Sequence, residues 1–210
     1  MHSRKHITTL SLGIAIVLVV SSATEIHSFK YKELREGCNN TDIKRFWNTT
    51  EPVWTYATAT KLGSSLSCLV DVKINDTGSY TFFERYHYSS DKKGREILGL
   101  KGFISVGNEY SYTGMLFDYA YNSTQYASER LLYQSKNDSC GVFMFSIHPD
   151  VFRLDLRVRN SSVANGPDLG CYVFFLKSYE EHKRRKTEIS NVTLYNSSCH
   201  AILQSPTNAC

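Results

Sequence analysis

The sequence is poor in the residues and motifs that divide a chain or mark an enzyme. It has only four prolines, no low-complexity stretch and no internal repeat, so we find no linker between domains. It contains no Gly-x-Ser-x-Gly nucleophile motif and no glycine-rich phosphate loop, and none of its seven histidines lies in a hydrolase or metalloprotease motif. We therefore expect a protein that is not an enzyme and has no catalytic residues.

Signals for metals and nucleic acids are absent as well. No Cys-x-x-Cys pair and no Cys/His cluster with zinc-finger spacing occurs, so we expect no metal and no cofactor. The formal charge of +4 over 210 residues is too small for the strongly basic face that nucleic acids require. What the chain does have is 14 tyrosines and 11 phenylalanines, and such residues fit the half-buried surface of a β-sheet.

The first 23 residues have the pattern of a secretory signal peptide. The pattern consists of a basic start at Arg4 and Lys5, an apolar run over residues 7–20 and small residues before a cleavage site after Ala23. The run is shorter than the roughly 20 residues that span a bilayer, and no second run of that length follows. We expect residues 24–210 to form one secreted, extracellular domain with a formal charge of +2 and no membrane partner.

Cysteines and glycosylation sequons agree with export. All six cysteines follow the expected cleavage site, and an even count in an exported chain is typical of three disulfides. They are Cys38, Cys68, Cys140, Cys171, Cys199 and Cys210. The Asn-x-Ser/Thr sequons, which accept N-linked glycans on exposed turns, are at Asn39, Asn48, Asn75, Asn122, Asn137, Asn160, Asn191 and Asn196. We expect a disulfide-bonded glycoprotein whose sequons mark surface loops.

Most of the chain is predicted to form short antiparallel strands. Residues 69–74 and 152–159 alternate apolar with polar or charged residues, which predicts strands with the apolar face buried and the charged face in solvent. The other predicted strands, rich in aromatic residues, are 54–60, 80–88, 96–106, 110–119, 127–134, 141–147 and 171–177. Eight or nine short strands at near-regular spacing are typical of a β-sandwich or a barrel, and periodicity alone does not choose between them.

Helices are predicted near both ends of this series. Residues 32–47 form a short lead-in helix. Its inward-facing side chains are Ile43, Phe46 and Trp47. Ser178, with Glu181 three residues on, matches a capping box, which predicts a polar helix over residues 178–190 on the outside of the sheet. Two i,i+4 pairs would support this helix, Glu180 with Arg184 and Glu181 with Arg185.

Six motifs occur in order along the chain: Trp54, Ser67-Cys68-Leu69-Val70, Tyr80-Thr81-Phe82-Phe83-Glu84-Arg85-Tyr86, Cys140-Gly141-Val142, Gly170-Cys171-Tyr172-Val173-Phe174 and Cys199. This ordered set resembles the tick salivary lipocalin family, whose members are similar to histamine-binding proteins. The set covers essentially the whole mature chain. The resemblance implies an all-β fold, an eight-stranded antiparallel lipocalin barrel with a short N-terminal helix and a C-terminal helix. It also implies a protein of tick saliva that sequesters a small host mediator in the barrel and so serves host immune evasion.

The same resemblance implies how the cysteines pair. A bridge between the second strand and the C-terminal segment would be Cys68–Cys199 here, and a bridge between two late strands would be Cys140–Cys171. Cys38 would then join Cys210 and tie down the tail of the domain. Some relatives instead tie the N-terminal segment to the late strand, which would give Cys38–Cys171 and Cys140–Cys210. The sequence leaves both arrangements open.

The two motifs around Cys140 and Cys171 bear on the ligand. Amine-binding relatives look like Cys-Asp-Val in one late strand and Glu-Leu-Trp or Glu-Leu-Tyr in the next. A desolvated cationic amine needs such carboxylates as partners. This chain lacks both acids at these places. The acidic residues on predicted strands that could substitute are Glu84, Glu109 and Asp118. We therefore expect a fatty-acid mediator such as a leukotriene or thromboxane, as other relatives hold, with histamine or serotonin as the alternative.

A fatty-acid mediator needs an apolar, aromatic wall and a cation or hydroxyl groups for its carboxylate. The candidates for the wall are Trp54, Phe83, Tyr112, Phe117 and Met144. The candidates for the head group are Arg85 and Arg130, and Arg85 shares its strand parity with Phe83. For Trp54 the resemblance also implies a place at the floor of the barrel. A host plasma protein bound by the outer surface, such as complement or a chemokine, is the alternative partner, and we expect a monomer.

Overall fold

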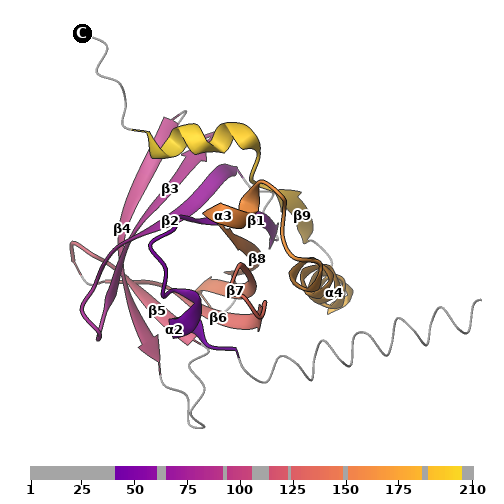
Figure 1. The fold of residues 1–210 in the computed structure, drawn as a ribbon, viewed down its shortest axis with the longest axis horizontal. Helices are drawn as coiled ribbons and strands as arrows, with labels where there is room; N and C mark the ends of the chain where they lie inside the picture. The colour runs from indigo at the N-terminus through magenta and orange to yellow at the C-terminus, as the bar shows by residue number, and fades with distance from the viewer. Residues whose placement is uncertain are drawn as a thin grey trace, which may run out of the picture. The chain divides into compact units, whose positions relative to one another are not determined.

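The computed structural model describes residues 41–60, 65–91, 94–105, 114–122, 124–148, 151–185 and 189–204. Eight antiparallel strands, β1 to β8, form a closed ring in which β1 pairs with both β8 and β2 (Figure 1). The expected eight-stranded antiparallel barrel is therefore confirmed. The strands are β1 (Val53–Thr60), β2 (Leu66–Asp76), β3 (Thr81–Ser89), β4 (Gly94–Ser105), β5 (Gly114–Tyr119), β6 (Gln125–Gln134), β7 (Cys140–His148) and β8 (Val151–Arg159).

A ninth strand lies along the junction of β1 and β2. The direct pairing between β1 and β2 covers only Val53 and Trp54 of β1. Farther along, β1 pairs with β9 (Ser190–Thr193), and the Leu194 carbonyl after β9 accepts a hydrogen bond from the Cys68 N–H of β2 at 2.9 Å. The C-terminal segment therefore completes the ring where β1 and β2 separate, a role that the sequence did not predict.

Helices cover the outside and one end of the barrel. The short α2 (Ile43–Phe46) lies at the end where β1 begins, the longer α4 (Leu169–Arg185) lies outside β6, β7 and β8, and α3 (Asn160–Val163) follows β8 (Figure 1). The 3₁₀ helix η2 (Ser197–Leu203) contacts β2 and β3. The inward-facing positions predicted for the lead-in helix are confirmed, because all three side chains are at most 2 % exposed. Residues 32–40 of that predicted helix lie outside the described residues.

The prediction of a strand over 171–177 is wrong, because these residues form the first half of α4. A short apolar run fits a buried strand and a helix equally well, and here the fully buried residues are Cys171 and Phe175, which are spaced i,i+4 on one helix face. Asp168 begins the helix by accepting a hydrogen bond from the Gly170 N–H at 2.7 Å. The capping box predicted at Ser178 therefore lies inside the helix and does not begin it.

The predicted helix pairs have different outcomes. Arg185 and Glu181 form the expected exposed ion pair at 2.8 Å. The Arg184 guanidinium instead donates a hydrogen bond to the carbonyl oxygen of Glu180 at 3.4 Å.

Two separate groups of buried apolar side chains lie on the two faces of the barrel wall. The outer layer packs between the sheet, α4 and η2, and includes Trp54, Leu154, Leu156, Val158 and Phe175. The inner cluster lies inside the barrel on the α2 side, and its members include Phe46, Trp47, Phe83, Phe117 and Phe143. The protein therefore has hydrophobic packing on both faces of one sheet.

This arrangement reverses the solvent-facing side predicted for residues 152–159. Leu154 and Leu156 point outward and are covered by α4, whereas Asp155 and Arg157 point into the barrel and are 0 % exposed. In β2 the apolar Ile74 is 56 % exposed, whereas the neighbouring Asp71 is 2 % exposed. The alternation was real, but the charged face is the interior of the barrel and not a surface in solvent.

Two disulfides fasten the outer layer. Cys68–Cys199 joins β2 to η2, and Cys140–Cys171 joins β7 to α4. Both pairs are the ones that the first arrangement implied, and the bridge between Cys140 and Cys171 excludes the alternative arrangement. The first bridge links residues 131 apart in sequence, so it restricts a long stretch of the unfolded chain. The expected pair Cys38–Cys210 lies outside the described residues.

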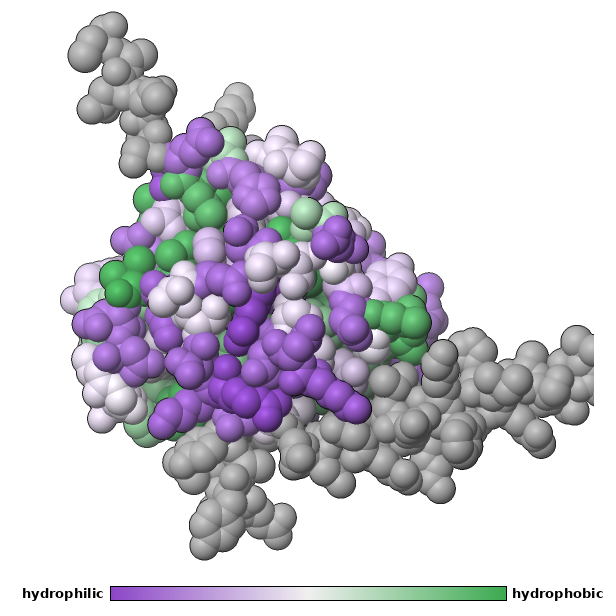
Figure 2. All heavy atoms as spheres, in the orientation of Figure 1, coloured by the Kyte–Doolittle hydropathy of each residue, from purple (hydrophilic) through white to green (hydrophobic). Residues whose placement is uncertain are grey.

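The face of the molecule shown in Figure 2 is mainly hydrophilic. Figure 2 shows that hydrophobic residues on the viewed face form small areas scattered among hydrophilic ones. Exposed apolar side chains include Ile97, Phe103 and Leu116 on β4 and β5. No helix within the described residues is long and apolar enough to cross a membrane, and the expected signal peptide, residues 1–23, lies outside them.

Candidate functional site: a buried ionic cluster inside the barrel

The interior of the barrel holds six charged side chains that we call the inner ionic cluster. They come from β2, β3, β6 and β8, and all point inward from alternate positions of their strands. The members are Asp71, Arg85, Glu129, Arg153, Asp155 and Arg157. Five of the six side chains are at most 3 % exposed, and Arg153 is 15 % exposed. Three acids therefore balance three arginines in a space that is almost closed to water.

Ion pairs connect every member of the inner ionic cluster. Arg85 grips Asp71 with two hydrogen bonds, from Nε at 2.6 Å and from Nη2 at 2.8 Å. Arg157 lies between the acids, with Nη2 2.8 Å from Glu129 Oε2 and 3.3 Å from Asp155 Oδ2. Arg153 donates from Nε to Asp155 Oδ2 at 3.0 Å. Buried charges are tolerated when they are paired and hydrogen-bonded in this way.

The pKa values of the buried acids differ in direction. Burial alone would raise the pKa of Asp71, but Arg85 outweighs it and holds that pKa below its usual value. The same opposition lowers the pKa of Asp155, where Arg153 and Arg157 outweigh burial. For Glu129 burial dominates over the attraction of Arg157 and raises the pKa. Glu129 is therefore the acid of the cluster that most readily accepts a proton.

The side of the cluster facing α2 is closed by aromatic rings. Trp47 follows α2 and donates a hydrogen bond from its indole Nε1 to Glu129 Oε1 at 3.1 Å. Its ring meets Phe83 at 4.7 Å between centroids, and Phe143 lies 4.6 Å from the guanidinium of Arg157. A surface hollow of about 590 Å³ lies between α2 and the β2–β3 turn and is also lined by Trp47. We call the layer formed by the rings of Trp47, Phe83 and Phe143 the floor of the barrel.

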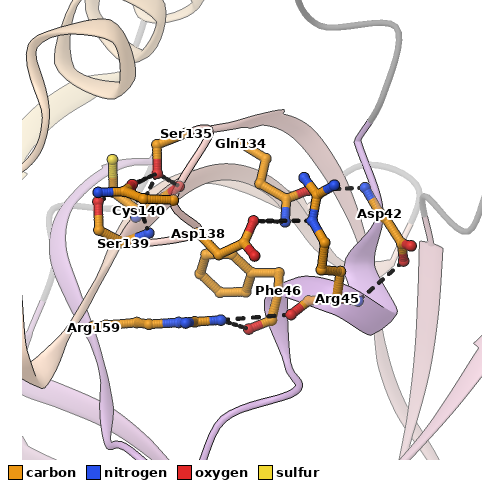
Figure 3. A network of polar contacts seen from close by, with 10 residues as sticks. Asp42, Arg45, Phe46, Gln134, Ser135, Asp138, Ser139, Cys140 and Arg159 are labelled. Atoms are coloured by element: carbon orange, nitrogen blue, oxygen red, sulfur yellow. Dashed lines mark hydrogen bonds and ion pairs between the residues drawn. The ribbon is translucent and has the colours of Figure 1, made fainter.

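A polar network holds α2 against the floor end of the barrel (Figure 3). The N–H of Asp42 donates to Gln134 Oε1 at 2.8 Å, and Arg45 Nε donates to Asp138 Oδ1 at 3.1 Å. Arg159, at the end of β8, donates from Nη2 to the carbonyl oxygen of Phe46 at 2.7 Å. These bonds join α2 to strands β6 and β8 and to the β6–β7 turn, so the floor is fixed by contacts at several points.

The other side of the inner ionic cluster, away from α2, is less tightly closed. Tyr119, Tyr126 and Leu98 pack against the inner cluster but remain partly exposed. Tyr119 and Tyr126 meet at 4.9 Å between ring centroids, and Tyr126 meets Phe145 at 6.0 Å. Phe145 in turn lies under the guanidinium of Arg153 at 4.1 Å. Aromatic and apolar surface that solvent can reach therefore lies next to the cluster on this side.

Unsatisfied hydrogen-bond donors are a further property of the cluster. Within the described residues, Nη1 of Arg85, Nη2 of Arg153, and Nε and Nη1 of Arg157 are buried without a hydrogen-bond partner. Among the acceptors of the cluster, Glu129 Oε2 is also buried without a hydrogen-bond partner, although it lies in the ion pair with Arg157. A buried donor without a partner costs about 1–3 kcal/mol. These donors are available to a hydrogen-bond acceptor that reaches the cluster.

The structure brings together some of the predicted site residues. Phe83, Arg85 and Phe117 all lie inside the barrel and are at most 2 % exposed, and Arg85 stands 5.6 Å from the Phe117 ring centroid. Arg130 is exposed and has the opposite parity to the inward-facing Glu129. Tyr112 lies outside the described residues.

Trp54 and Met144 lie on the outward face of the wall. Trp54 is buried in the outer layer, and its indole donates to Asn160 Oδ1 at 2.9 Å. Met144 is paired with Leu154, which also belongs to the outer layer. The floor position that the resemblance implied for Trp54 is taken by Trp47, because β1 points Trp54 away from the interior.

The sequence did not predict the acids of the inner ionic cluster. Asp71, Glu129 and Asp155 lie inside, whereas Asp118 is partly exposed beside Lys101 and Glu84 has the opposite parity to Arg85. Glu109 lies outside the described residues. The sequence did contain a usable signal. The charged residues of β8 alternate with residues that are apolar enough to be buried themselves. Without knowledge of the covering helix, that alternation was assigned to the wrong side.

Comparison with known proteins gives the fold. No protein family model and no curated protein matches the sequence. Among solved structures, the siderocalin Ex-FABP matches with a TM-score of 0.51 and 9 % identity, over 70 % of this chain and 95 % of that one. The chain has the lipocalin fold.

Two other lipocalin-fold structures are similar at lower scores. Japanin from Rhipicephalus appendiculatus, bound to cholesterol, has a TM-score of 0.44 at 9 % identity, over 70 % of this chain and 95 % of that one. Lobster apocrustacyanin A1 has a TM-score of 0.45 at 14 % identity, over 76 % of this chain and 89 % of that one. Identities this low concern the fold and not the ligand.

Proposed function

We propose that this protein is a secreted carrier that binds and sequesters one small amphipathic molecule inside its barrel. The ligand class that we propose is a fatty-acid mediator, such as a leukotriene or thromboxane, bound with its carboxylate at the inner ionic cluster. The observation that carries this proposal is the excess of buried guanidinium donors that lack a hydrogen-bond partner within the described residues. A carboxylate offers two acceptor oxygens and forms strong, charge-assisted bonds with such donors.

The head group would meet Arg153 first. Arg153 is the most exposed member of the cluster, and its Nη2 is one of the donors without a partner. Arg85, the head-group candidate from the sequence, has Nη1 left for a ligand because Asp71 occupies Nε and Nη2. The partly exposed rings of Tyr119 and Tyr126 would line the path of an acyl chain.

A biogenic amine is the alternative ligand, and the buried acids favour considering it. A cationic ligand would need a carboxylate, and each acid of the cluster already has an arginine partner. The amine would have to displace an arginine that cannot lose its own charge. The siderocalin of the same fold functions through dual ligand specificities, so one such barrel can serve two kinds of ligand. The donor excess nevertheless favours an acceptor-bearing ligand here.

Calorimetric titration of the secreted protein tests the proposal with four probes: leukotriene B4, arachidonic acid, its methyl ester and histamine. We expect 1:1 binding of a free acid and much weaker binding of the ester, which lacks the charge. Replacing Arg153 by Gln should weaken the acid by about 1.5–3 kcal/mol, the range for a hydrogen bond to a charged group.

Arg130→Gln is the matched control, because it removes the same charge from an exposed position on the same barrel. It should leave the affinity for the acid unchanged. Binding of histamine alone, or equal binding of acid and ester, would contradict a carboxylate site at the cluster.

A further inference from the structure

A second hollow lies on the outside of the barrel, on the opposite face of the wall from the inner ionic cluster, because the β1 residues around Tyr56 pair with Arg157 and Asp155 of that cluster. It has a volume of about 430 Å³, within the roughly 300 to 1,000 Å³ of small-molecule sites. Its lining comes from β1, from the segment between α3 and α4 and from the start of η2. The lining residues that matter here are Tyr56, Asn165, Tyr195, Asn196 and His200. We call it the tyrosine hollow.

Aromatic rings form the wall of the tyrosine hollow. Tyr56 and Tyr195 stack with 6.0 Å between centroids and 27° between planes. The Tyr195 hydroxyl lies 2.9 Å from His200 Nε2, and burial raises the pKa of Tyr195. The Tyr56 hydroxyl stands near Gly166, which also lines the hollow. Rings with polar tips of this kind suit a ligand that has both apolar and hydroxylated faces.

Asn196, at the edge of the hollow, can itself carry a group with apolar and hydroxylated faces, namely an N-linked glycan. It is exposed, it begins the sequon Asn196-Ser197-Ser198, and it lines the hollow. Its Oδ1 accepts the N–H of Ser198 at 2.9 Å as the N-cap of η2, which leaves the amide nitrogen, the atom that a glycan would join, outside that bond. A first sugar on Asn196 would begin at the mouth of the hollow.

We propose that the tyrosine hollow is the docking site of the N-linked glycan on Asn196, with the first N-acetylglucosamine packed on Tyr56 and Tyr195. The sugar ring offers C–H groups to the aromatic faces and hydroxyl and acetamide groups to the Tyr56 hydroxyl and His200. The inference rests on the secretion proposed above, because such glycans are added during export. It does not depend on which ligand the barrel holds.

The docked sugar would cover a structurally important part of the outer layer. Trp54 lies beneath the hollow, 5.3 Å from Tyr195 and 5.1 Å from His200 between ring centroids. Cys199, three residues after Asn196, carries the bridge to β2. A sugar on these rings would hold η2 and the segment after β9 against β1, where the C-terminal segment completes the ring. The glycan would therefore stabilise the barrel as well as coat it.

The sequon at Asn122 provides a matched control. Asn122 is exposed in the β5–β6 turn, and its Oδ1 accepts the N–H of Thr124 at 3.0 Å, as Asn196 accepts that of Ser198. It does not line the tyrosine hollow. Ser198→Ala and Thr124→Ala each abolish one sequon and keep the backbone bond to the asparagine. Ser198→Thr keeps the sequon at Asn196.

The test begins with protein secreted from insect cells, in which peptide mapping by mass spectrometry reports occupancy at each sequon. We expect Asn196 to be occupied and Ser198→Ala to lower the Tm by about 2–4 °C, the shift expected for loss of one aromatic contact in a domain of this size. Thr124→Ala and Ser198→Thr should leave the Tm unchanged. Ser198→Ala also removes the hydrogen bond from the Ser198 hydroxyl to Asn196 Oδ1. Enzymatic removal of all glycans should therefore shrink the Tm difference between Ser198→Ala and the wild type, and the part that disappears is the contribution of the sugar.

A second readout locates the sugar. In protein with ¹³C-labelled glycans, the N-acetylglucosamine signals of Asn196 should shift upfield through the Tyr ring currents and lose that shift in Tyr56→Leu. An unoccupied Asn196, equal Tm changes for the two sequon deletions, or unshifted signals would each overturn the docking. None of these results would bear on ligand titrations, so the carrier proposal would stand or fall separately.

Discussion

The two faces of strand β8 show how differently this barrel uses its two sides. Outward, Leu154 and Leu156 pack under α4 in a layer that also holds both described disulfides. Inward, Asp155 and Arg157 lie in an ionic cluster with unsatisfied donors. One face is apolar and covalently fastened, and the other is charged and incompletely satisfied.

This difference separates stability from binding. In many small domains the inside of the sheet is the hydrophobic core, whereas here part of that core lies outside the barrel. The outer layer can hold the fold together, so the interior can carry charges that a ligand can bind. Buried ion pairs add little stability by themselves, but removal of one partner is costly. Substitutions on the two faces should therefore fail in different ways.

The largest expected effect comes from the inner face. Arg157→Met should lower the free energy of unfolding by about 3–5 kcal/mol, because it leaves Glu129 buried without its cation. Chemical denaturation measures this loss. The double variant Arg157→Met/Glu129→Leu should recover part of it, because Asp71 keeps Arg85 and Asp155 keeps Arg153. No recovery in the double variant would argue that the cluster does not act as pairs.

On the outer face, Leu156→Ala should lower the free energy of unfolding by about 2–5 kcal/mol through the cavity it leaves beside α4. The affinity for the ligand, measured on the fraction of the variant that remains folded, should not change. The Leu156 side chain points away from the inner ionic cluster. A loss of affinity larger than tenfold without a change in fold would break the proposed separation of the two faces.

Acid should weaken the inner face of the barrel through Asp71 and Asp155. Burial opposes ionisation of Asp71 and Asp155, but the arginines outweigh it and lower both pKa values. A lowered folded-state pKa stabilises the protein above the unfolded pKa of 3.8, and this contribution disappears as the pH falls through the folded pKa. Stability measured from pH 5 downward should therefore decline.

The variant Asp71→Asn tests the source of that decline. Its stability should fall less steeply below pH 4 than that of the wild type. Glu129, whose pKa is raised by burial, acts in the opposite direction and favours the folded state below its unfolded value of 4.5. A decline as steep in Asp71→Asn as in the wild type would place its cause outside this pair.

Several parts of the fold were readable from the sequence. Within the described residues, strands with aromatic-rich runs were placed correctly except for residues 171–177, where an apolar run of seven residues fits a strand or a helix. The predicted strand residues 106 and 110–113 lie outside the described residues. The inward positions of Phe46 and Trp47 followed from their spacing. The pairing of Cys68 with Cys199 came from the resemblance and not from the residues themselves. The roles of β9 and η2 were not readable, since both are short.

The site was harder to read than the fold. A period of two separates the faces of a strand but does not say which face a helix covers, so Asp155 and Arg157 were placed in solvent. Arg85 was placed inside because it shares parity with Phe83, and the structure buries both. Arg130 has no aromatic residue two positions away on either side, and it is exposed.

The two tryptophans allow the most direct test of ligand binding inside the barrel. Trp47 donates its indole N–H to Glu129 inside, and Trp54 donates its indole N–H to Asn160 outside. In ¹H–¹⁵N spectra, with the signals assigned by Trp→Phe variants, titration with arachidonic acid should shift the Trp47 indole signal and leave that of Trp54 in place. A saturable shift of Trp54 alone, or no shift of Trp47 at full occupancy, would contradict binding at the inner ionic cluster.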